Sequence, residues 1–138
     1  MLEVDGAIDR AGEGDADYVR YFVDWAASHP GHRCTVVVRR DEIIGMAWLA
    51  IGTRVPTPRA FERLGGDIQS VYVTPSERNR GIGHRLLADM VKQADELGLQ
   101  HVTVHASPRS ITAYERVGFT TGPRFMHRVR GGDADVVR

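Results

Sequence analysis

Hydrophobic residues recur every three to four positions in two segments, which is the spacing of one face of an α-helix. The first segment covers residues 16–27, with Asp15 as a suitable N-cap. The second follows Gly83 and runs to Leu97, where Gly98 is expected to end it. The apolar faces comprise Tyr18, Phe22, Trp25 and Ala26 in the first segment and Leu86, Leu87, Met90, Val91, Ala94 and Leu97 in the second.

Runs of β-branched and apolar residues predict the strands. Residues 34–38 and 43–51 flank a short polar stretch, so they are expected to form an antiparallel hairpin. Further strands are predicted at residues 67–73, at 101–106, at 119–129 with an interruption by Gly122-Pro123, and more weakly at 7–11.

The segments between the predicted helices and strands are expected to form a long loop and a further short helix. Residues 52–66 contain two prolines and a Gly-Gly pair and are interpreted as a long loop with one helical turn at 59–64. A short helix is expected from Ser107 through Arg116, before Gly118. The order of elements is a hairpin followed by a strand–helix–strand–helix–strand unit, which predicts an α/β domain.

Length and composition narrow the class of protein. A chain of 138 residues is the size of one domain, so a single domain over residues 1–138 is expected, with a frayed tail at 131–138. The only cysteine, Cys34, favours a reducing compartment. The longest apolar run, 43–51, is too short to span a membrane, and the acidic N-terminus does not resemble a signal peptide. A cytoplasmic protein is the expectation.

Charge excludes two classes of partner. Eighteen Lys and Arg residues balance eighteen Asp and Glu residues, whereas proteins that bind nucleic acid or anionic membranes usually carry a basic excess. Neither partner is therefore expected. The distribution matters more than the sum, because Arg78, Arg80 and Arg85 gather in one short segment.

That segment carries the strongest chemical signal. A strand is followed by Arg78-x-x-Gly81-x-Gly83 and then by an amphipathic helix. The first backbone N–H groups of a helix have no intrahelical partner and lie at its positive end, so they favour an anion such as a pyrophosphate. Leu86 stands where a dinucleotide fingerprint needs a third glycine, and His84-Arg85 stands where a P-loop needs Lys-Ser/Thr.

Two blocks resemble the GCN5-related N-acetyltransferase (GNAT) family. Residues 71–83, Val-Tyr-Val-Thr-Pro followed by the Arg78-x-x-Gly81-x-Gly83 turn, are similar to its acetyl-CoA motif, and residues 113–119, Ala-Tyr-Glu-Arg-Val-Gly-Phe, are similar to its Tyr-Glu-Arg-x-Gly-Phe segment. The resemblance implies a mixed, mostly antiparallel sheet flanked by helices. It also implies transfer of an acetyl group from acetyl-CoA, as co-substrate, to an amine in a ternary complex.

The resemblance assigns roles to residues. Val71, Tyr72 and Val73 would present main chain to the pantetheine and thioester, in a strand that splays from its neighbour. Tyr114 would protonate the leaving thiolate, although a core tyrosine is the alternative. Ser107 stands where the family often has Asn and could cap the last helix or reach the pantetheine. The pyrophosphate would be wrapped by Arg78, Asn79, Arg80, Gly81, Ile82, Gly83 and His84.

The residue that would remove a proton from the acceptor amine is harder to predict. Strand alternation places Asp67 and Gln69 on one face with Val71 and Val73, so Asp67 could take the proton, although a solvated carboxylate is as good an interpretation. No metal site is expected, because His101 and His105 would lie about 13 Å apart along one strand. Cys34 has no evident base partner and is not expected to be a nucleophile.

The acceptor is left open. It could be a small-molecule or peptide amine, with Trp25, Trp48, Phe61 or His127 near its site and the 52–66 loop setting specificity. A non-catalytic acyl-CoA sensor of the same fold is the main alternative, since fold does not fix function. A homodimer is compatible with the sequence.

Overall fold

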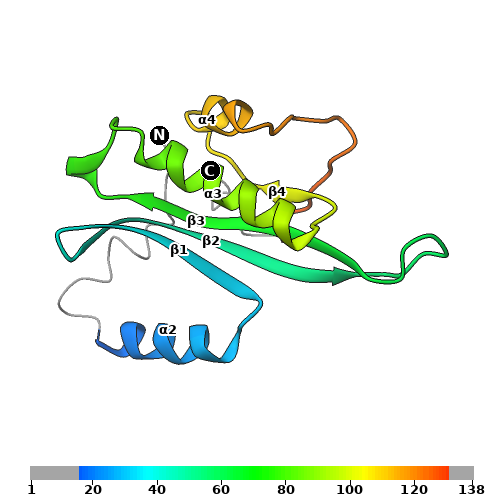
Figure 1. Cartoon of the computed structure of the whole chain (residues 1–138), viewed down its shortest axis with the longest axis horizontal. Helices are drawn as coiled ribbons and strands as arrows, with labels where there is room; N and C mark the ends of the chain where they lie inside the picture. Colours follow the sequence, from blue (N-terminus) through cyan, green and yellow to red (C-terminus); the bar gives the residue numbers. More distant parts are fainter. Residues whose placement is uncertain (1–15, 131–138) are drawn as a thin grey trace.

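A computed structural model describes residues 16–130 of the chain. The described part has three layers: α2 on one face of a sheet, the sheet itself, and α3 with α4 on the other face (Figure 1). The elements are α2 (Ala16–Ser28), β1 (His32–Arg39), β2 (Glu42–Arg54), β3 (Arg63–Val73), the 3-10 turn η1 (Pro75–Glu77), α3 (Ile82–Leu97), β4 (Val102–Val104) and α4 (Ile111–Arg116).

The sheet has four strands in the order β1-β2-β3-β4. The first two pairs are antiparallel, and β3 runs parallel to β4 because α3 connects them as a crossover. The mixed, mostly antiparallel sheet flanked by helices is therefore confirmed. No helix among residues 16–130 combines the length and the apolar character that crossing a bilayer requires.

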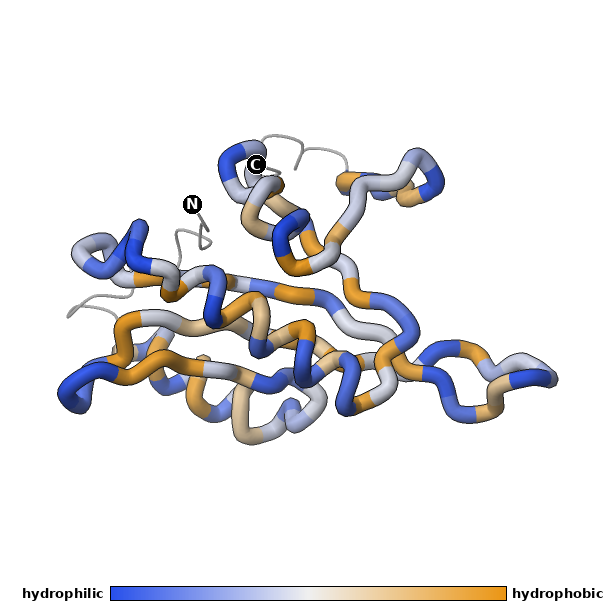
Figure 2. The backbone as a smooth tube through the Cα atoms, turned by 45° about the horizontal axis from the view of Figure 1, so that its top comes forward, coloured by the Kyte–Doolittle hydropathy of each residue, from blue (hydrophilic) through white to orange (hydrophobic). Residues whose placement is uncertain are grey.

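The core lies between the sheet and α3. Leu49 from β2 and Leu86, Leu87 and Met90 from α3 are each exposed by less than 2%. The apolar residues of α3 recur as predicted, and Figure 2 shows hydrophobic and hydrophilic residues alternating along this helix. Gly98 ends α3 in the left-handed conformation (φ 71°) with its N–H bonded to the last turn, as expected.

The opposite face of the sheet is covered more thinly. None of the residues of α2 is buried, and the helix meets the sheet through aromatic rings. The Phe22 ring contacts Trp48 edge-on with centroids 5.5 Å apart, and the Trp25 and Trp48 centroids are 6.1 Å apart. Among residues 16–130, Trp48 Nε1 is buried and has no hydrogen-bond partner. Within the described part of the chain, this face is therefore held by a few ring contacts rather than by a closed core.

The hairpin between β2 and β3 is longer than the sequence suggested. Strand pairing continues to Arg54 opposite Arg63, so the predicted loop at 52–66 shrinks to residues 55–62, and the expected helical turn at 59–64 is absent. The glycines that suggested a loop are strand residues. A Cβ on Gly66 would lie 2.8 Å from Leu99 Cδ1, so close packing requires glycine there.

The C-terminal part also departs from expectation. Residues 119–130 form no strand, because Gly122-Pro123 makes a turn in which Phe125 N–H bonds to the Gly122 carbonyl. The predicted strand at 101–106 is confined to β4, and the predicted helix from Ser107 begins at Ile111. The predictions for residues 7–11 and 131–138 lie outside the described residues.

Candidate functional site

A bulge in β3 sets the orientation of its side chains. Pairing with β2 shifts register between Tyr72 opposite Met46 and Gln69 opposite Trp48, and Ser70 has φ 52°. An extra residue reverses the alternation beyond it. Ile68, Val71 and Val73 consequently share the buried face, with exposures of 4%, 3% and 3%.

The bulge corrects one prediction. Asp67 and Gln69 were expected to share a face with Val71 and Val73, but they lie on the other face of β3 because the alternation is interrupted between them. Bulges are common beside active sites, where they redirect a side chain or end a pairing. The sequence contains no glycine at this point that would have signalled the bulge.

The sheet opens directly after Ile68. Pairing between β3 and β4 spans Gly66 to Ile68 opposite Val102 to Val104 and then stops. In the described part of the chain, residues 69–73 therefore have no β4 partner on that side. An open strand edge of this kind can pair with an extended ligand. Val71–Val73, predicted to splay from the neighbouring strand, lie among these residues, and the carbonyl of Val73 accepts a hydrogen bond from Arg78 Nε at 2.8 Å.

The open edge leads into the glycine turn. Asn79 (φ 65°) and Gly81 (φ 82°) are left-handed, and Gly81 is the N-cap of α3 without a side-chain cap hydrogen bond. The first intrahelical bond runs from Arg85 N–H to the Gly81 carbonyl at 3.1 Å, so the N–H groups of residues 82–84 precede it. A Cβ on Gly81 would meet no atom within 4 Å, so the space on that side of the turn is open.

The three arginines in and beside the turn, Arg78, Arg80 and Arg85, contact different parts of the protein. The Arg78 guanidinium lies over the Tyr72 ring, 5.5 Å from its centroid, and bonds back to β3. Arg80 faces Glu77 at 3.7 Å. Arg85, with His84, lines a hollow between α3 and β1. The structure therefore brings Arg78 and Arg80 to the turn, whereas Arg85 lies toward the β1 side of the helix.

Tyr114 is the buried phenol of the region. It is 6% exposed, sits in α4 and packs edge-on against Phe119 with centroids 5.4 Å apart. Burial, and secondarily the charge of Asp67, raises the pKa of Tyr114 to about 12. The hydroxyl therefore keeps its proton throughout the neutral range and can act as a hydrogen-bond donor.

Asp67 is held by Gln69, which the sequence placed on the same face, and by Thr103, which sequence reasoning did not identify. Thr103 Oγ1 on β4 donates to Asp67 Oδ1 at 2.7 Å, and Gln69 Nε2 donates to Oδ2 at 3.1 Å. The parallel register places Asp67 directly opposite Thr103. The fold thus brings Asp67 close enough to Tyr114 for its charge to act there, although 47 positions separate them.

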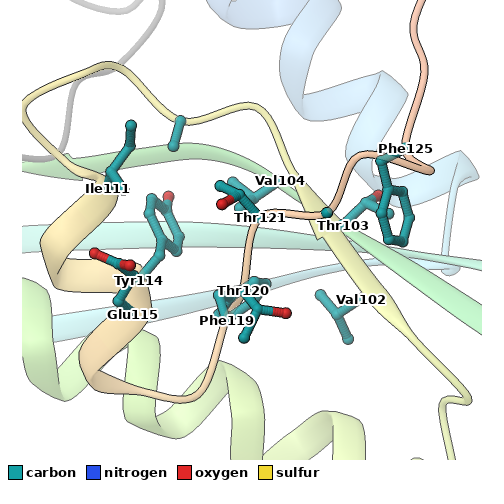
Figure 3. Close-up of a pocket in the computed structure, with 12 residues that line it drawn as sticks. Val102, Thr103, Val104, Ile111, Tyr114, Glu115, Phe119, Thr120, Thr121 and Phe125 are labelled. Carbon is teal, nitrogen blue, oxygen red and sulfur yellow. The ribbon is translucent and has the colours of Figure 1, made fainter.

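A hollow of about 310 Å³ lies beside Tyr114. Figure 3 shows Val102 and Val104 from β4, Tyr114 from α4, and Phe119 and Phe125 from the following segment around it. The lining is mainly apolar, with threonine hydroxyls at its edge. The hollow therefore lies next to the Tyr114 side chain and is lined by residues of both β4 and α4.

Ser107 has a different local role from the expected cap. The N-cap of α4 is Ser110, which is 2% exposed and makes no side-chain cap hydrogen bond. The Ser110 hydroxyl instead donates to the Ser107 carbonyl at 3.0 Å and lies 3.0 Å from the Ser107 hydroxyl. The two serines close the turn before α4, which leaves the contact of Ser107 with a pantetheine as a prediction.

The other candidates are dispersed. His101 Nε2 lies 2.7 Å from an Arg54 nitrogen, and the rings of His105 and His127 are 6.0 Å apart. Phe61 is 77% exposed in the 55–62 loop and does not join the Trp25–Trp48 cluster. Within residues 16–130 no three His, Cys, Asp or Glu side chains gather as metal ligands.

Cys34 lies in β1, at the edge of the described sheet. Desolvation raises the pKa of its thiol, which disfavours the nucleophilic thiolate.

Comparison with known proteins agrees with this geometry. A sequence model of the acetyltransferase (GNAT) family matches residues 4–119. Glucosamine 6-phosphate N-acetyltransferase of Trypanosoma brucei brucei is 34% identical over 87 residues, a match that covers 61% of this chain and 55% of that protein. The match thus spans only about half the length of that curated relative.

Solved structures share the fold. An acetyltransferase of Trypanosoma brucei has a TM-score of 0.72 at 26% identity, covering 91% of this chain and 87% of that one. A predicted acetyltransferase of Clostridium acetobutylicum, crystallised with acetyl-CoA, has a TM-score of 0.67 at 22% identity, covering 85% and 75%.

Proposed function

The chain belongs to the acetyltransferase (GNAT) family, and on this basis we propose that it transfers an acetyl group from acetyl-CoA to a primary amine by direct attack in a ternary complex. One observation carries the proposal: the open edge of β3 after Ile68 leads directly to the uncapped N-terminus of α3. An extended arm that ends in a pyrophosphate would match these two features in that order.

The residues present suit such a co-substrate. Backbone at Val71 would pair with the pantetheine arm and polarise the thioester carbonyl, and Tyr72 would support Arg78 through its ring. The N–H groups at the start of α3 would receive the pyrophosphate, with Arg80 beside them. The cradle comprises Arg78, Asn79, Arg80, Gly81, Ile82, Gly83 and His84. Gly81 leaves open the space into which a side chain would project.

The proposed chemistry is a direct displacement. The neutral amine attacks the thioester carbon, a C–N bond forms, and the oxygen becomes an oxyanion that a backbone N–H of β3 stabilises. The C–S bond then breaks, and Tyr114 donates a proton or a hydrogen bond to the departing sulfur. A pKa raised to about 12 keeps the phenol protonated when the thiolate leaves, so the hydroxyl is suited to donate a hydrogen bond to the departing sulfur.

The amine must also lose a proton. Asp67 is our candidate to accept it, directly or through water, since its carboxylate is fixed by Thr103 and Gln69. Asp67 lies on the face of the sheet opposite the buried Val71 and Val73. The acceptor is accordingly proposed to approach from the face that α2 covers.

The acceptor is proposed to be a primary amine, and its identity is approached through the relatives of the chain. The likeness to a glucosamine 6-phosphate N-acetyltransferase makes glucosamine 6-phosphate the first amine to test. Other small amines and peptide amines follow. The single cysteine supports a reducing compartment such as the cytoplasm.

A spectrophotometric assay of CoA thiol release tests the proposal. The panel contains glucosamine 6-phosphate, a polyamine, an aminoglycoside, free lysine and a peptide with a free N-terminus. Acetyl-CoA-dependent release with at least one amine is expected. Tight binding of acetyl-CoA without release from any amine would instead favour an acyl-CoA sensor, and absence of binding would overturn the proposal.

Tyr114→Phe tests the acid. Removing the hydroxyl should lower kcat about 100-fold while the Kd for acetyl-CoA stays within about twofold, because general acid catalysis acts on the transition state. Tyr21→Phe, at a residue 70% exposed on α2, makes the same chemical change as a control. Unchanged kcat in Tyr114→Phe would remove the acid role.

A further inference from the structure

The tip of the β1–β2 hairpin lies beside the proposed pyrophosphate turn, although about 40 positions separate them in the sequence. Figure 1 shows this tip and the β3–α3 connection at the same end of the sheet. A two-residue turn makes the tip, with Arg40 (φ 49°) and Asp41 (φ 63°) both left-handed, as a type I′ hairpin requires. Arg39, the last residue of β1, is thereby directed to the same end.

Two contacts join the hairpin to the turn. The carbonyl of Ile44, where the β1–β2 register shifts, accepts a hydrogen bond from Thr74 N–H at 2.8 Å. An Arg39 guanidinium nitrogen donates to Glu77 Oε2 in a short ion pair. These contacts flank η1, the segment that leads into the cradle.

Glu77 is the centre of this arrangement. Its side chain is only 17% exposed, and the same oxygen that accepts from Arg39 lies 3.7 Å from an Arg80 nitrogen. Arg80 is 61% exposed and its contact is the longer one. A partly buried carboxylate that loses one cationic partner is left uncompensated and draws more strongly on any other cation nearby.

We propose that Arg39 is a positioning residue for co-substrate binding: it neutralises Glu77 and so leaves the Arg80 guanidinium available to the anionic end of acetyl-CoA. This inference rests on the proposed function and adds to it a residue from a different element. Without Arg39, the Glu77 carboxylate would pair closely with Arg80, three positions away, and remove that cation from the ligand. Arg39 would thus act through Glu77 and Arg80.

Isothermal titration calorimetry of acetyl-CoA with the full chain tests the inference. Arg39→Gln should weaken binding about tenfold, the size of one charge-assisted hydrogen bond. The double variant Arg39→Gln with Glu77→Gln should return to within about twofold of wild type, because the competing carboxylate is gone. Arg39→Lys should bind as wild type does, since a lysine also neutralises Glu77.

A matched control separates this effect from net charge. Arg40→Gln removes one positive charge from the same hairpin, at an exposed residue, and should leave the Kd unchanged. Thermal melting of each variant verifies that it is folded. If Arg39→Gln binds normally, or if the double variant remains as weak as the single one, the inference is overturned, because Arg39 then acts by direct contact or not at all.

The same titration separates failure of the proposed function from failure of the proposed role of Arg39. Wild-type protein that fails to bind acetyl-CoA overturns the proposed function, and the inference falls with it. Wild-type protein that binds while Arg39→Gln is unaffected overturns only the role of Arg39.

Discussion

The two faces of the sheet differ in how firmly they are packed. On the α3 face, Leu49 and Leu87 are fully buried, and the open edge of β3 and the turn before α3 are built against this core. On the α2 face, the helix contributes no buried residue and meets the sheet through Phe22 and Trp25. Rigid packing therefore supports the side where the co-substrate is proposed to bind.

This difference in packing suits a site that binds two ligands with different requirements. A pyrophosphate bound by backbone N–H groups needs a fixed array of donors, which a dense core supplies. An acceptor that approaches Asp67 needs room on the thinly covered face. We infer that stability resides in the α3 face and adaptability in the α2 face.

The largest effect is expected in the core. Leu87→Ala should lower the free energy of unfolding by about 3 kcal/mol, because Leu87 is 0% exposed and its truncation leaves a cavity. Val23→Ala on α2, at a residue 59% exposed, should change it by less than about 0.5 kcal/mol. Urea unfolding followed by circular dichroism measures both. Equal losses would show that α2 is as firmly packed as α3.

A smaller change in the free energy of unfolding is expected when the buried phenol of Tyr114 ionises at high pH. The pKa of Tyr114 is raised to about 12, above the ordinary value of 10.0, so its contribution is fully present below pH 10 and is lost as the pH rises to 12. The loss attributable to Tyr114 should approach about 2 kcal/mol by pH 12, at 1.36 kcal/mol per pKa unit. Unfolding titrations between pH 9 and 12 measure it.

The Tyr114→Phe variant supplies the control for that titration. Its unfolding free energy should fall less steeply between pH 10 and 12, since every other group titrates as in wild type. Identical slopes in the two proteins would mean that the tyrosine ionises with its ordinary pKa in the folded state.

The elements with a strong local signal could be predicted from the sequence. The 3.6-residue period located α2 and α3 to within a residue or two, and Gly98 correctly ended α3. The glycine turn was recognisable because Gly81 adopts the left-handed conformation that glycine accepts readily. That residues 1–138 form one domain stays a prediction.

Features that depend on distant contacts could not be predicted. The bulge at Ser70 exists because β2 and β3 pair on both sides of it, and no local pattern marks a shift in register. Gly66 suggested a loop, yet it is a strand residue that leaves room for Leu99. The Arg39–Glu77 pair joins residues 38 positions apart, and each alone is an ordinary surface charge.

The smallest effect concerns the α2 face. Trp48 Nε1 is buried and has no hydrogen-bond partner among the described residues, and an unsatisfied buried donor costs free energy. Trp48→Phe removes that donor and keeps an aromatic ring against Phe22, so the lost packing and the relieved N–H should nearly cancel. The free energy of unfolding is expected to change by less than about 1 kcal/mol. A loss above about 2 kcal/mol would show that the α2 face is packed as tightly as the core, and the division between the two faces would then fail.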